Sequence, residues 1–533
     1  MTSGQGATET EMYAEGSGTM RDDTPVIIGV GQFTYRGQAD TSPSPLDLLK
    51  IAADRAAIDA GLPEGALSQL DGVAVVGFTI DAPGGFQQLP FPRLKNPPAS
   101  FAKSVGADPS FEIYTHMGGN SPQQLVNTLC ERIARGENEL TIALGAEFLG
   151  SLMKRLKGGK GFAGWEDPYA VEDEPKRMGD PRPGTTPQEN AHGLNRPINV
   201  YPMFENALRA RDGRSIEDHQ KRLGKLFAPF SKVASANPHA WFPTERSEEE
   251  VITVTDQNRM ISFPYPKYLN AIMEVDQSAG VIIASVRKAR ELGIPESKWV
   301  YLHGCADASD LWYPSDRQDF HSSPAMRLTG KRAFEMARIG PEDLAYIDLY
   351  SCFPIAVEVG AEELGLSLDD PRGLTVTGGL PYMGGPGNNY AMHSIATMIG
   401  KLRDHPGSWG LCTANGWYLT KQSTGIYSTT PVEGVWERED PAVIQRQIDA
   451  LPHPTIVEHP EGPATIEAYT VVHTRDGYHM GIVFGRDSHD RRFIAVTPDD
   501  EATLKDLEAR EGVGRSGVVG RHPDGKRNLF VPD

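Results

Sequence analysis

The chain has 533 residues, enough for several structural units with large cores, and this length excludes a small disulfide-stabilised scaffold. Its mean hydropathy of −0.39 and its 23% of charged residues are typical of a folded globular protein. The net charge of −19 would repel phosphate backbones and anionic lipid, so nucleic acid is not an expected partner.

The cysteines are too few for a disulfide framework and too widely spaced for a zinc motif, so we expect reduced thiols, no metal and a cytoplasmic location. They are Cys130, Cys305, Cys352 and Cys412. No apolar run approaches the ~18 residues that a membrane-spanning helix needs. Residues 1–23 lack the basic and apolar regions of a signal peptide and are predicted to be a disordered lead-in.

Strand and helix patterns alternate along the first part of the chain. A β-branched run at 25–33 precedes a helical pattern at 46–60, a second strand pattern at 73–80, a helix at 122–135 and a strand at 141–148. This alternation is typical of an α/β fold with parallel βαβ units.

The second half of the chain repeats the first. At offsets of 277 to 279, a run of prolines, an arginine and acidic residues recurs in the same order. The matched residues are Pro45, Arg55, Pro63, Glu64 and Asp71 in the first half, and Pro324, Arg332, Pro341, Glu342 and Asp348 in the second. We therefore expect two similar α/β halves, at residues 24–297 and 298–432.

Two further regions lie outside the repeat. An insertion at about 150–275 is rich in Gly, Pro and charge at first, and then shows helical patterns at 200–213 and 215–237. Residues 433–533 form a linker followed by short strand patterns with turn signals and one short helical pattern. These patterns predict a small β-rich C-terminal domain, for which an OB-like barrel is one candidate.

The glycine turn at 118–122 contains the first candidate site residue. Ser121 is a suitable N-cap, Pro122 suits the first helical position, and Gln124 can complete a capping box. Free N–H groups at this helix start would attract a thioester oxygen, a phosphate or a thiolate. The alternative is a turn that only caps the helix.

The second half has four candidate features. Gly384 and Gly385 belong to a glycine-rich loop that lets a ligand approach the main chain, and His393 lies off the apolar stripe of the helix that follows. Tyr350 ends a buried strand, where open α/β sheets keep their ligand crevices, and Cys412 is predicted to face the same crevice. The alternatives are a structural histidine and a thiol packed in the core.

These motifs together resemble the thiolase superfamily, and within it the sterol-carrier-protein-type thiolases and thiolase-like proteins. The resemblance covers about residues 24–430 and rests on GAEF, DLYSCF, GGPGNNYAMHS and CTANGW, and the tail resembles the additional C-terminal domain of type 1 thiolase-like proteins. It implies a five-layered αβαβα fold with an inserted loop domain, acyl-CoA chemistry of lipid metabolism, and a homodimer, with a monomer as the alternative.

The sequence departs from the family's catalytic motifs. By this resemblance, Gly119 stands at the position of the acyl-accepting cysteine, and Gly385 replaces the histidine of the Gly-His-Pro motif. Tyr350 replaces a residue that helps to hold an oxyanion water. Cys412 matches the second family cysteine, which acts as acid and base at the α-carbon.

Three functions stay open on the sequence alone. They are acyl transfer in the acetyl-CoA acetyltransferase class without a covalent intermediate, retro-aldol cleavage of a β-hydroxyacyl-CoA, and non-enzymatic acyl-CoA binding. The resemblance implies a CoA thioester as ligand or substrate and no tightly bound cofactor. Because the chain is acidic, we expect basic residues of the insertion to hold the CoA phosphates. The candidates are Lys154, Arg155, Lys157 and Lys232.

Overall fold

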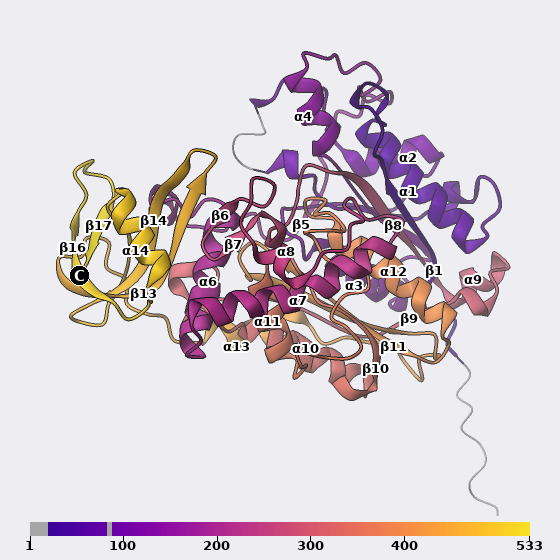
Figure 1. The fold of residues 1–533 in the computed structure, drawn as a ribbon. Helices are drawn as coiled ribbons and strands as arrows, with labels where there is room; N and C mark the ends of the chain where they lie inside the picture. Colours follow the sequence, from indigo (N-terminus) through magenta and orange to yellow (C-terminus); the bar gives the residue numbers. More distant parts are fainter. Residues whose placement is uncertain (1–19, 83–87) are drawn as a thin grey trace, which may run out of the picture.

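The computed structural model describes residues 20–82 and 88–533, so most of the predicted lead-in at 1–23 lies outside the described residues. Two sheets and three layers of helices form the body of the molecule (Figure 1). The first sheet has the strand order β1-β8-β4-β2-β3-β5 and the second has β9-β12-β11-β10. The shared order of four strands confirms the duplication.

The elements of the two halves correspond one to one, apart from one extra helix and one extra strand in the first half; the insertion adds a further strand, β5 (Arg177–Met178), to the first sheet. The first half contains β1 (Pro25–Thr34), α1 (Pro45–Ala60), β2 (Gly72–Val75), α2 (Pro97–Val105), β3 (Phe111–Thr115), α3 (Ser121–Ala134), β4 (Leu140–Phe148), β8 (Asp276–Ser285) and α9 (Val286–Glu291). The second contains β9 (Tyr301–Ser309), α10 (Pro324–Ala337), β10 (Leu344–Asp348), α11 (Pro354–Glu363), α12 (Tyr390–Asp404), β11 (Trp409–Gly416) and β12 (Lys421–Ser428). The sequence patterns missed β3, β8 and β12.

Equivalent residues build equivalent contacts in the two halves. In α1, the Ser44 side chain accepts a hydrogen bond from the Asp47 N–H, and Gly61 ends the helix at φ +75°. A β-carbon on Gly29 of β1 would overlap a carbonyl oxygen of α1, and one on Gly304 of β9 would overlap a carbonyl oxygen of α10. Glycine at both positions lets each outer helix lie directly on its sheet.

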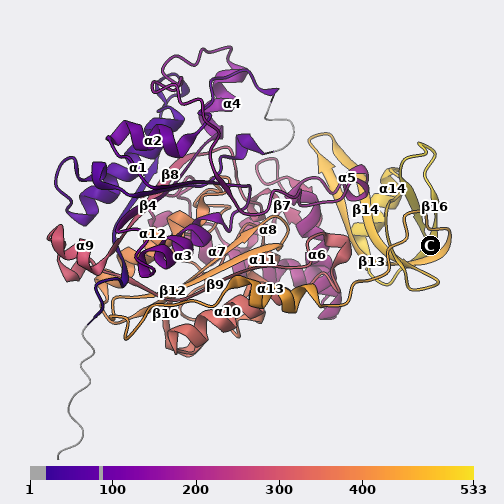
Figure 2. The same ribbon diagram turned by 180° about the vertical axis from the view of Figure 1, so that it is seen from behind.

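Helices α3 and α12 pack against each other between the two sheets and form the middle layer (Figure 2). Leu125 and Leu129 of α3 and Ile395 and Met398 of α12 are fully buried there. Together with α1 on one outer face and α10 on the other, this arrangement confirms the predicted αβαβα layering.

The insertion between β4 and β8 combines helices, short strands and long loops. It contains α4 (Leu149–Lys157), β5 (Arg177–Met178), α5 (Pro187–Ala191), α6 (Pro197–Arg211), α7 (Ile216–Ala236), α8 (Glu248–Ile252), β6 (Met260–Ser262) and β7 (Tyr265–Pro266). Helices α6 and α7 confirm the two helical patterns of the sequence.

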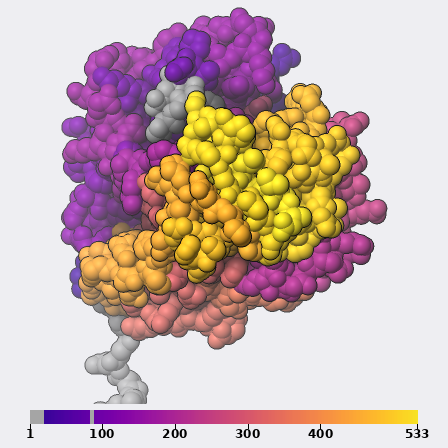
Figure 3. Space-filling view, turned by 90° about the vertical axis from the view of Figure 1, so that its left-hand side faces the viewer, coloured from indigo at the N-terminus to yellow at the C-terminus, as the bar shows by residue number. Residues whose placement is uncertain are grey.

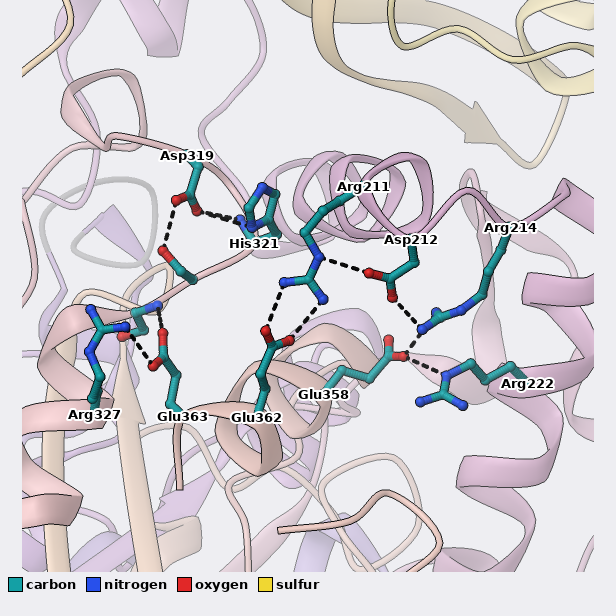
Figure 4. A network of polar contacts seen from close by, with 12 residues as sticks. Arg211, Asp212, Arg214, Arg222, Asp319, His321, Arg327, Glu358, Glu362 and Glu363 are labelled. Atoms are coloured by element: carbon teal, nitrogen blue, oxygen red, sulfur yellow. Dashed lines mark hydrogen bonds and ion pairs between the residues drawn. The ribbon is translucent and has the colours of Figure 1, made fainter. Parts of the chain in front are cut away.

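An ionic network joins the insertion to the second half (Figure 4). Arg211 at the end of α6 binds Glu362 of α11 through two hydrogen bonds of 3.0 and 2.8 Å. Glu358, one turn earlier on α11, accepts a hydrogen bond of 3.2 Å from Arg222 of α7. Because Glu358 is buried, these contacts fix the insertion helices against α11.

The C-terminal domain is a closed barrel with one short helix, which confirms the predicted β-rich domain. After α13 (Pro441–Asp449), its elements are β13 (Gly462–Thr474), β14 (Gly477–Asp487), β15 (Arg492–Val496), α14 (Glu501–Ala509), β16 (Ser516–Arg521) and β17 (Asn528–Pro532). Strand β13 pairs with both β14 and β16, and this double pairing closes the barrel. The barrel lies at one end of the molecule against the insertion helices (Figure 3).

We predict that the protein is a monomer, because β5 of the insertion pairs with the outer edge of β3. The N–H groups of Tyr114 and His116 donate to the carbonyls of Lys176 and Met178, so the C-terminal part of this edge is already paired within the chain. Size-exclusion chromatography with light scattering should give the mass of one chain at micromolar concentration. A stable dimer under these conditions would contradict the prediction.

Candidate functional site

A cavity of about 420 Å³ lies where the two halves and the insertion meet. The first half contributes the turn from Met117 to Gly119, and the insertion contributes Arg196 and Tyr201, the latter from α6. The second half contributes Tyr350. Its other lining residues include Ile198, Met273, Cys352, Phe353, Leu380, Gly385, Gly387, Asn388, Asn415 and Trp417. Most of this lining is apolar, which suits an uncharged ligand group.

Tyr350 stands in the place where a side chain at position 119 would be. A β-carbon on Gly119 would overlap the Tyr350 hydroxyl and the carbonyl oxygen of Asn415. Burial, with a smaller contribution from Cys352, raises the pKa of Tyr350 well above its usual value, so the phenol stays protonated. Among the described residues, nothing accepts or donates a hydrogen bond at this hydroxyl, which lines the cavity.

Tyr201 of the insertion holds the loop that closes the cavity. Its hydroxyl donates to the carbonyl of Trp417 at 2.8 Å and accepts hydrogen bonds from Asn415 Nδ2 at 2.9 Å and the Leu419 N–H at 3.2 Å. Trp417 and Leu419 have φ values of +55° and +58°, which cost conformational energy in residues with side chains. The contacts of one hydroxyl therefore maintain a strained loop on the cavity wall.

Cys352 is the cysteine that lines the cavity. Burial raises its pKa to about 12, and Asn415 Nδ2 lies 3.9 Å from its Sγ atom. No histidine lines this cavity within the described part of the chain. A thiol in this environment is a poor nucleophile near neutral pH.

Cys412 does not face the crevice, and that prediction was wrong. Its side chain is 1% exposed, packs in the core between the sheets, and its Sγ atom accepts a hydrogen bond of 3.4 Å from Ser394 of α12. Successive residues of a strand point to opposite faces, and in β11 the residue that reaches the cavity is Asn415. Burial raises the pKa of the Cys412 thiol far above its usual value.

His393 lies off the apolar stripe but is fully buried. Its Nδ1 atom is 2.9 Å from Gln32 Oε1, and it does not line the cavity. Burial, and secondarily the nearby His239, lowers its pKa to about 3. It is therefore a neutral core residue at pH 7.

Ser121 does not cap α3, because it is already the first residue of that helix. The capping position belongs to Asn120, whose side chain makes no capping bond, and the Ser121 hydroxyl instead donates to the His116 carbonyl at 3.4 Å. A capping residue needs non-helical backbone angles, whereas Ser121 is already part of the helix. The turn still brings Gly119 to the cavity wall.

The glycine loop of the second half does reach the cavity. Gly385 lines it, whereas Gly384, at φ +109°, packs against the Gln277 side chain.

The sequence reasoning missed Glu147, which accepts hydrogen bonds from the N–H groups of Thr79 and Phe148 behind Gly387. Burial raises the pKa of Glu147 to about 7.

The basic residues predicted to bind the CoA phosphates do not line the cavity. Arg155 is buried and donates to the carbonyls of Gly161 at 2.5 Å and Asp40 at 3.1 Å, so it holds α4 in place. The exposed residues Lys154, Lys157 and Lys232 remain candidates by prediction only. Arg196 is the one cation of the described residues that lines the cavity.

We predict that Gly119→Ala lowers thermal stability, because the new methyl group meets Tyr350 and the Asn415 carbonyl. Tyr350→Ala in the same chain should recover part of the loss, since the ring is removed while the carbonyl stays. Gly400→Ala is the control: it lies in α12 with open space around it and should not destabilise the protein. Equal effects of Gly119→Ala and Gly400→Ala would contradict the packing.

We also predict that His393 contributes to acid destabilisation. Its folded pKa of about 3 lies below the ~6.5 of an unfolded histidine, so the unfolded state binds the extra proton and stability falls as the pH drops below about 6.5. The cost is on the order of 1 kcal/mol per pH unit down to pH 4. Urea unfolding of His393→Gln should show a shallower loss than the wild type, with the exposed His453→Gln as control. Parallel pH profiles would contradict this.

Comparison with known proteins agrees with this architecture. Residues 443–529 match the thiolase-like protein type 1 additional C-terminal domain, and residues 306–386 match the thiolase C-terminal domain-like family. An acetyl-CoA acetyltransferase of Methanothermobacter thermautotrophicus is 27% identical over 223 residues, which are 39% of this chain and 56% of that protein. The chain thus matches about half the length of this relative.

Solved structures extend the comparison to nearly the whole chain. The Ltp2-ChsH2(DUF35) aldolase has 20% identity and a TM-score of 0.55, covering 76% of this chain and 98% of that one, which shows the shared fold. No helix of the described residues is both long and apolar enough to cross a membrane. A monomeric SCP2-thiolase-like protein type 1 from Mycobacterium smegmatis has 38% identity and a TM-score of 0.81, covering 96% of this chain and 100% of that one. The chain belongs to the SCP2-thiolase-like protein type 1 family.

Proposed function

We propose that the protein binds an acyl-CoA thioester, with the acyl group in the cavity and the thioester carbonyl at the Tyr350 hydroxyl. The observation that carries this proposal is a protonated hydroxyl that has no hydrogen-bond partner among the described residues and belongs to the lining of a mostly apolar cavity of about 420 Å³. A carbonyl oxygen is the complementary acceptor for such a donor. The acetyl-CoA acetyltransferase relatives act on ligands of this class by their names.

The same geometry argues against chemistry through an acyl-enzyme. Position 119 carries no side chain, and Tyr350 fills the space that a nucleophile there would need. Cys352 has neither a lowered pKa nor a histidine beside it to take its proton. Acyl transfer without a covalent intermediate loses its proposed base as well, because Cys412 is packed in the core. Non-covalent binding is thus the function that the geometry supports best.

Retro-aldol cleavage of a β-hydroxyacyl thioester is the second candidate, favoured by the position of Tyr350. In this reaction a base takes the β-hydroxyl proton, the hydroxyl carbon becomes a carbonyl, the bond between the α- and β-carbons breaks, and its electrons form a thioester enolate. The base then returns the proton to the α-carbon of the enolate. No acyl-enzyme is formed. A neutral phenol at the thioester oxygen would stabilise the enolate by hydrogen bonding.

The test is calorimetric titration with acetyl-CoA, acetoacetyl-CoA and a branched β-hydroxyacyl-CoA, followed by mass spectrometry of products and protein. We predict binding without any covalent adduct. If cleavage occurs, Tyr350→Phe should lower kcat by ~100-fold with affinity changed less than threefold, because one enolate donor is removed. Tyr382→Phe is the matched control, since Tyr382 is buried with an unpartnered hydroxyl outside the cavity lining.

Three results would contradict parts of this proposal. Absence of binding for all three thioesters at millimolar concentration would overturn it, and an acyl adduct on the protein would overturn its non-covalent character. Cleavage that survives Tyr350→Phe unchanged would remove Tyr350 from the lyase mechanism. Binding without cleavage would leave the non-enzymatic binder.

A further inference from the structure

A second hollow of about 230 Å³ adjoins the cavity, and Met117 and Trp417 line both. It lies between the end of β3 and the segment that follows β5, and its lining includes His116, Arg177 and Arg182. The cavity lining is mostly apolar, whereas this hollow is lined by several charged side chains. The two spaces therefore suit different parts of a ligand.

The carboxylates of the hollow are already neutralised by other residues. Asp81 pairs with Arg93 at 3.2 Å and accepts a hydrogen bond of 2.5 Å from the Tyr114 hydroxyl. Asp180 is bound by Arg182, with the closest nitrogen–oxygen distance at 2.7 Å. Asp180 also acts on Lys421 through its charge, but among the described residues its one ion pair is the pair with Arg182.

Arg177 has no ion-pair partner among the residues that the structure describes. Its guanidinium lies over the Tyr114 ring, 4.7 Å from the ring centre, and this contact leaves its N–H groups available. Arg177 belongs to β5, whose pairing with β3 fixes the position of its backbone. A guanidinium that lies on the wall of a hollow and has no carboxylate partner can bind a planar or tetrahedral oxyanion through its N–H groups.

Lys421 stands behind the hollow, outside its lining residues; burial lowers its pKa to about 8, and the charge of Asp180 opposes this shift. Lys421 of β12 is 6% exposed, and its Nζ atom donates to the carbonyls of Met117 at 2.6 Å and Asp180 at 3.1 Å. No carboxylate among the described residues lies within ion-pair distance of it. After burial, Arg177 and Lys421 are the groups that lower the pKa of His116.

A neutral donor is also left over at the wall between the two spaces. The indole Nε1 of Trp417 is buried and has no acceptor among the described residues. Unpaired buried donors are rare in folded proteins and commonly mark a group that meets a ligand or water. Two cations and one free donor around one hollow, in a chain of net charge −19, make it locally attractive to an anion.

We propose that this hollow binds an anionic oxygen group, phosphate or carboxylate, of the same ligand whose acyl part fills the cavity, with Arg177 as its main contact. The proposal rests on the proposed function for the identity of that ligand. The anion comes either from the CoA phosphates or from a carboxylate on the acyl chain. Both sources have the same chemistry, and the experiment distinguishes them.

The experiment measures the affinity of four thioesters by calorimetry: valeryl-CoA, glutaryl-CoA, and the pantetheine thioesters of the same two acids. Valeryl and glutaryl have the same number of carbons and differ by the terminal carboxylate. The variants are Arg177→Gln, Arg177→Lys and the control Arg246→Gln, which removes an arginine stacked 3.9 Å from the centre of the Tyr268 ring, outside the hollow. Circular dichroism and thermal unfolding check that each variant is folded.

We expect Arg177→Gln to weaken binding at least tenfold for the two ligands that carry the anion held in the hollow, with Arg177→Lys intermediate and Arg246→Gln unchanged. A loss for both CoA thioesters and neither pantetheine thioester assigns the anion to the CoA phosphates. A loss for both glutaryl thioesters and neither valeryl thioester assigns it to the acyl carboxylate. Higher ionic strength should reduce the difference between wild type and Arg177→Gln.

Failure of the proposed function and failure of this inference give different results. If all four thioesters bind and Arg177→Gln binds each as the wild type does, the anion site is wrong while the proposed function stands. If no thioester binds, the proposed function fails, and inorganic phosphate titrated at constant ionic strength tests the hollow alone. A thermal stabilisation by phosphate that Arg177→Gln abolishes would support the site, and its absence in the wild type would overturn it.

Discussion

The contact between Gly119 and Tyr350 determines what the cavity can do. Gly119 comes from the turn before α3 in the first half, and Tyr350 follows β10 in the second half, so the contact exists only when the halves are packed together. The phenol and a nucleophilic side chain at position 119 cannot occupy the same space. The protein therefore offers a neutral hydrogen-bond donor where a side chain at position 119 would otherwise stand.

The insertion completes the site from its other side. Tyr201 of α6 holds the strained loop at Trp417, and α6 is in turn fixed by a buried cluster on the side of the helix facing α7 and α11. In that cluster Glu205 accepts hydrogen bonds from the Tyr265 hydroxyl and from His219 Nε2, the latter at 2.6 Å. Rigid support of this kind keeps cavity side chains in one geometry.

The same cluster shows how burial selects protonation states. Arg214 lies 3.2 Å from His219 Nδ1, so Nδ1 is the acceptor and the ring proton is on Nε2. Burial lowers the pKa of His219 to about 4 and raises that of Glu358 well above its usual value. Glu205, His219 and Glu358 lie close enough to one another to hold a metal ion, but the proton on His219 Nε2 occupies the lone pair that a metal would need.

Sequence reasoning found the fold more reliably than the site. The repeat is visible in the sequence because residues with equivalent structural roles recur in the same order, such as Pro45 and Pro324, which begin α1 and α10. The site depends on which face of a strand each residue takes and on backbone angles within a turn, so Cys412 and Ser121 were misplaced. Glu147 is a charged residue within an otherwise apolar strand, and this pattern could have marked it as a candidate residue in the sequence.

The distribution of charge explains why one ligand would need both spaces. A thioester and its acyl chain are uncharged, and they fit a wall of Tyr350, Phe353 and main-chain groups, where few charges compete with one hydrogen bond. An anionic group placed there would lose much of its hydration and would meet Arg196 as the one lining cation among the described residues. Arg177 supplies a cation in the adjoining hollow, which shares Met117 and Trp417 with the cavity, so an apolar space and a charged one lie side by side.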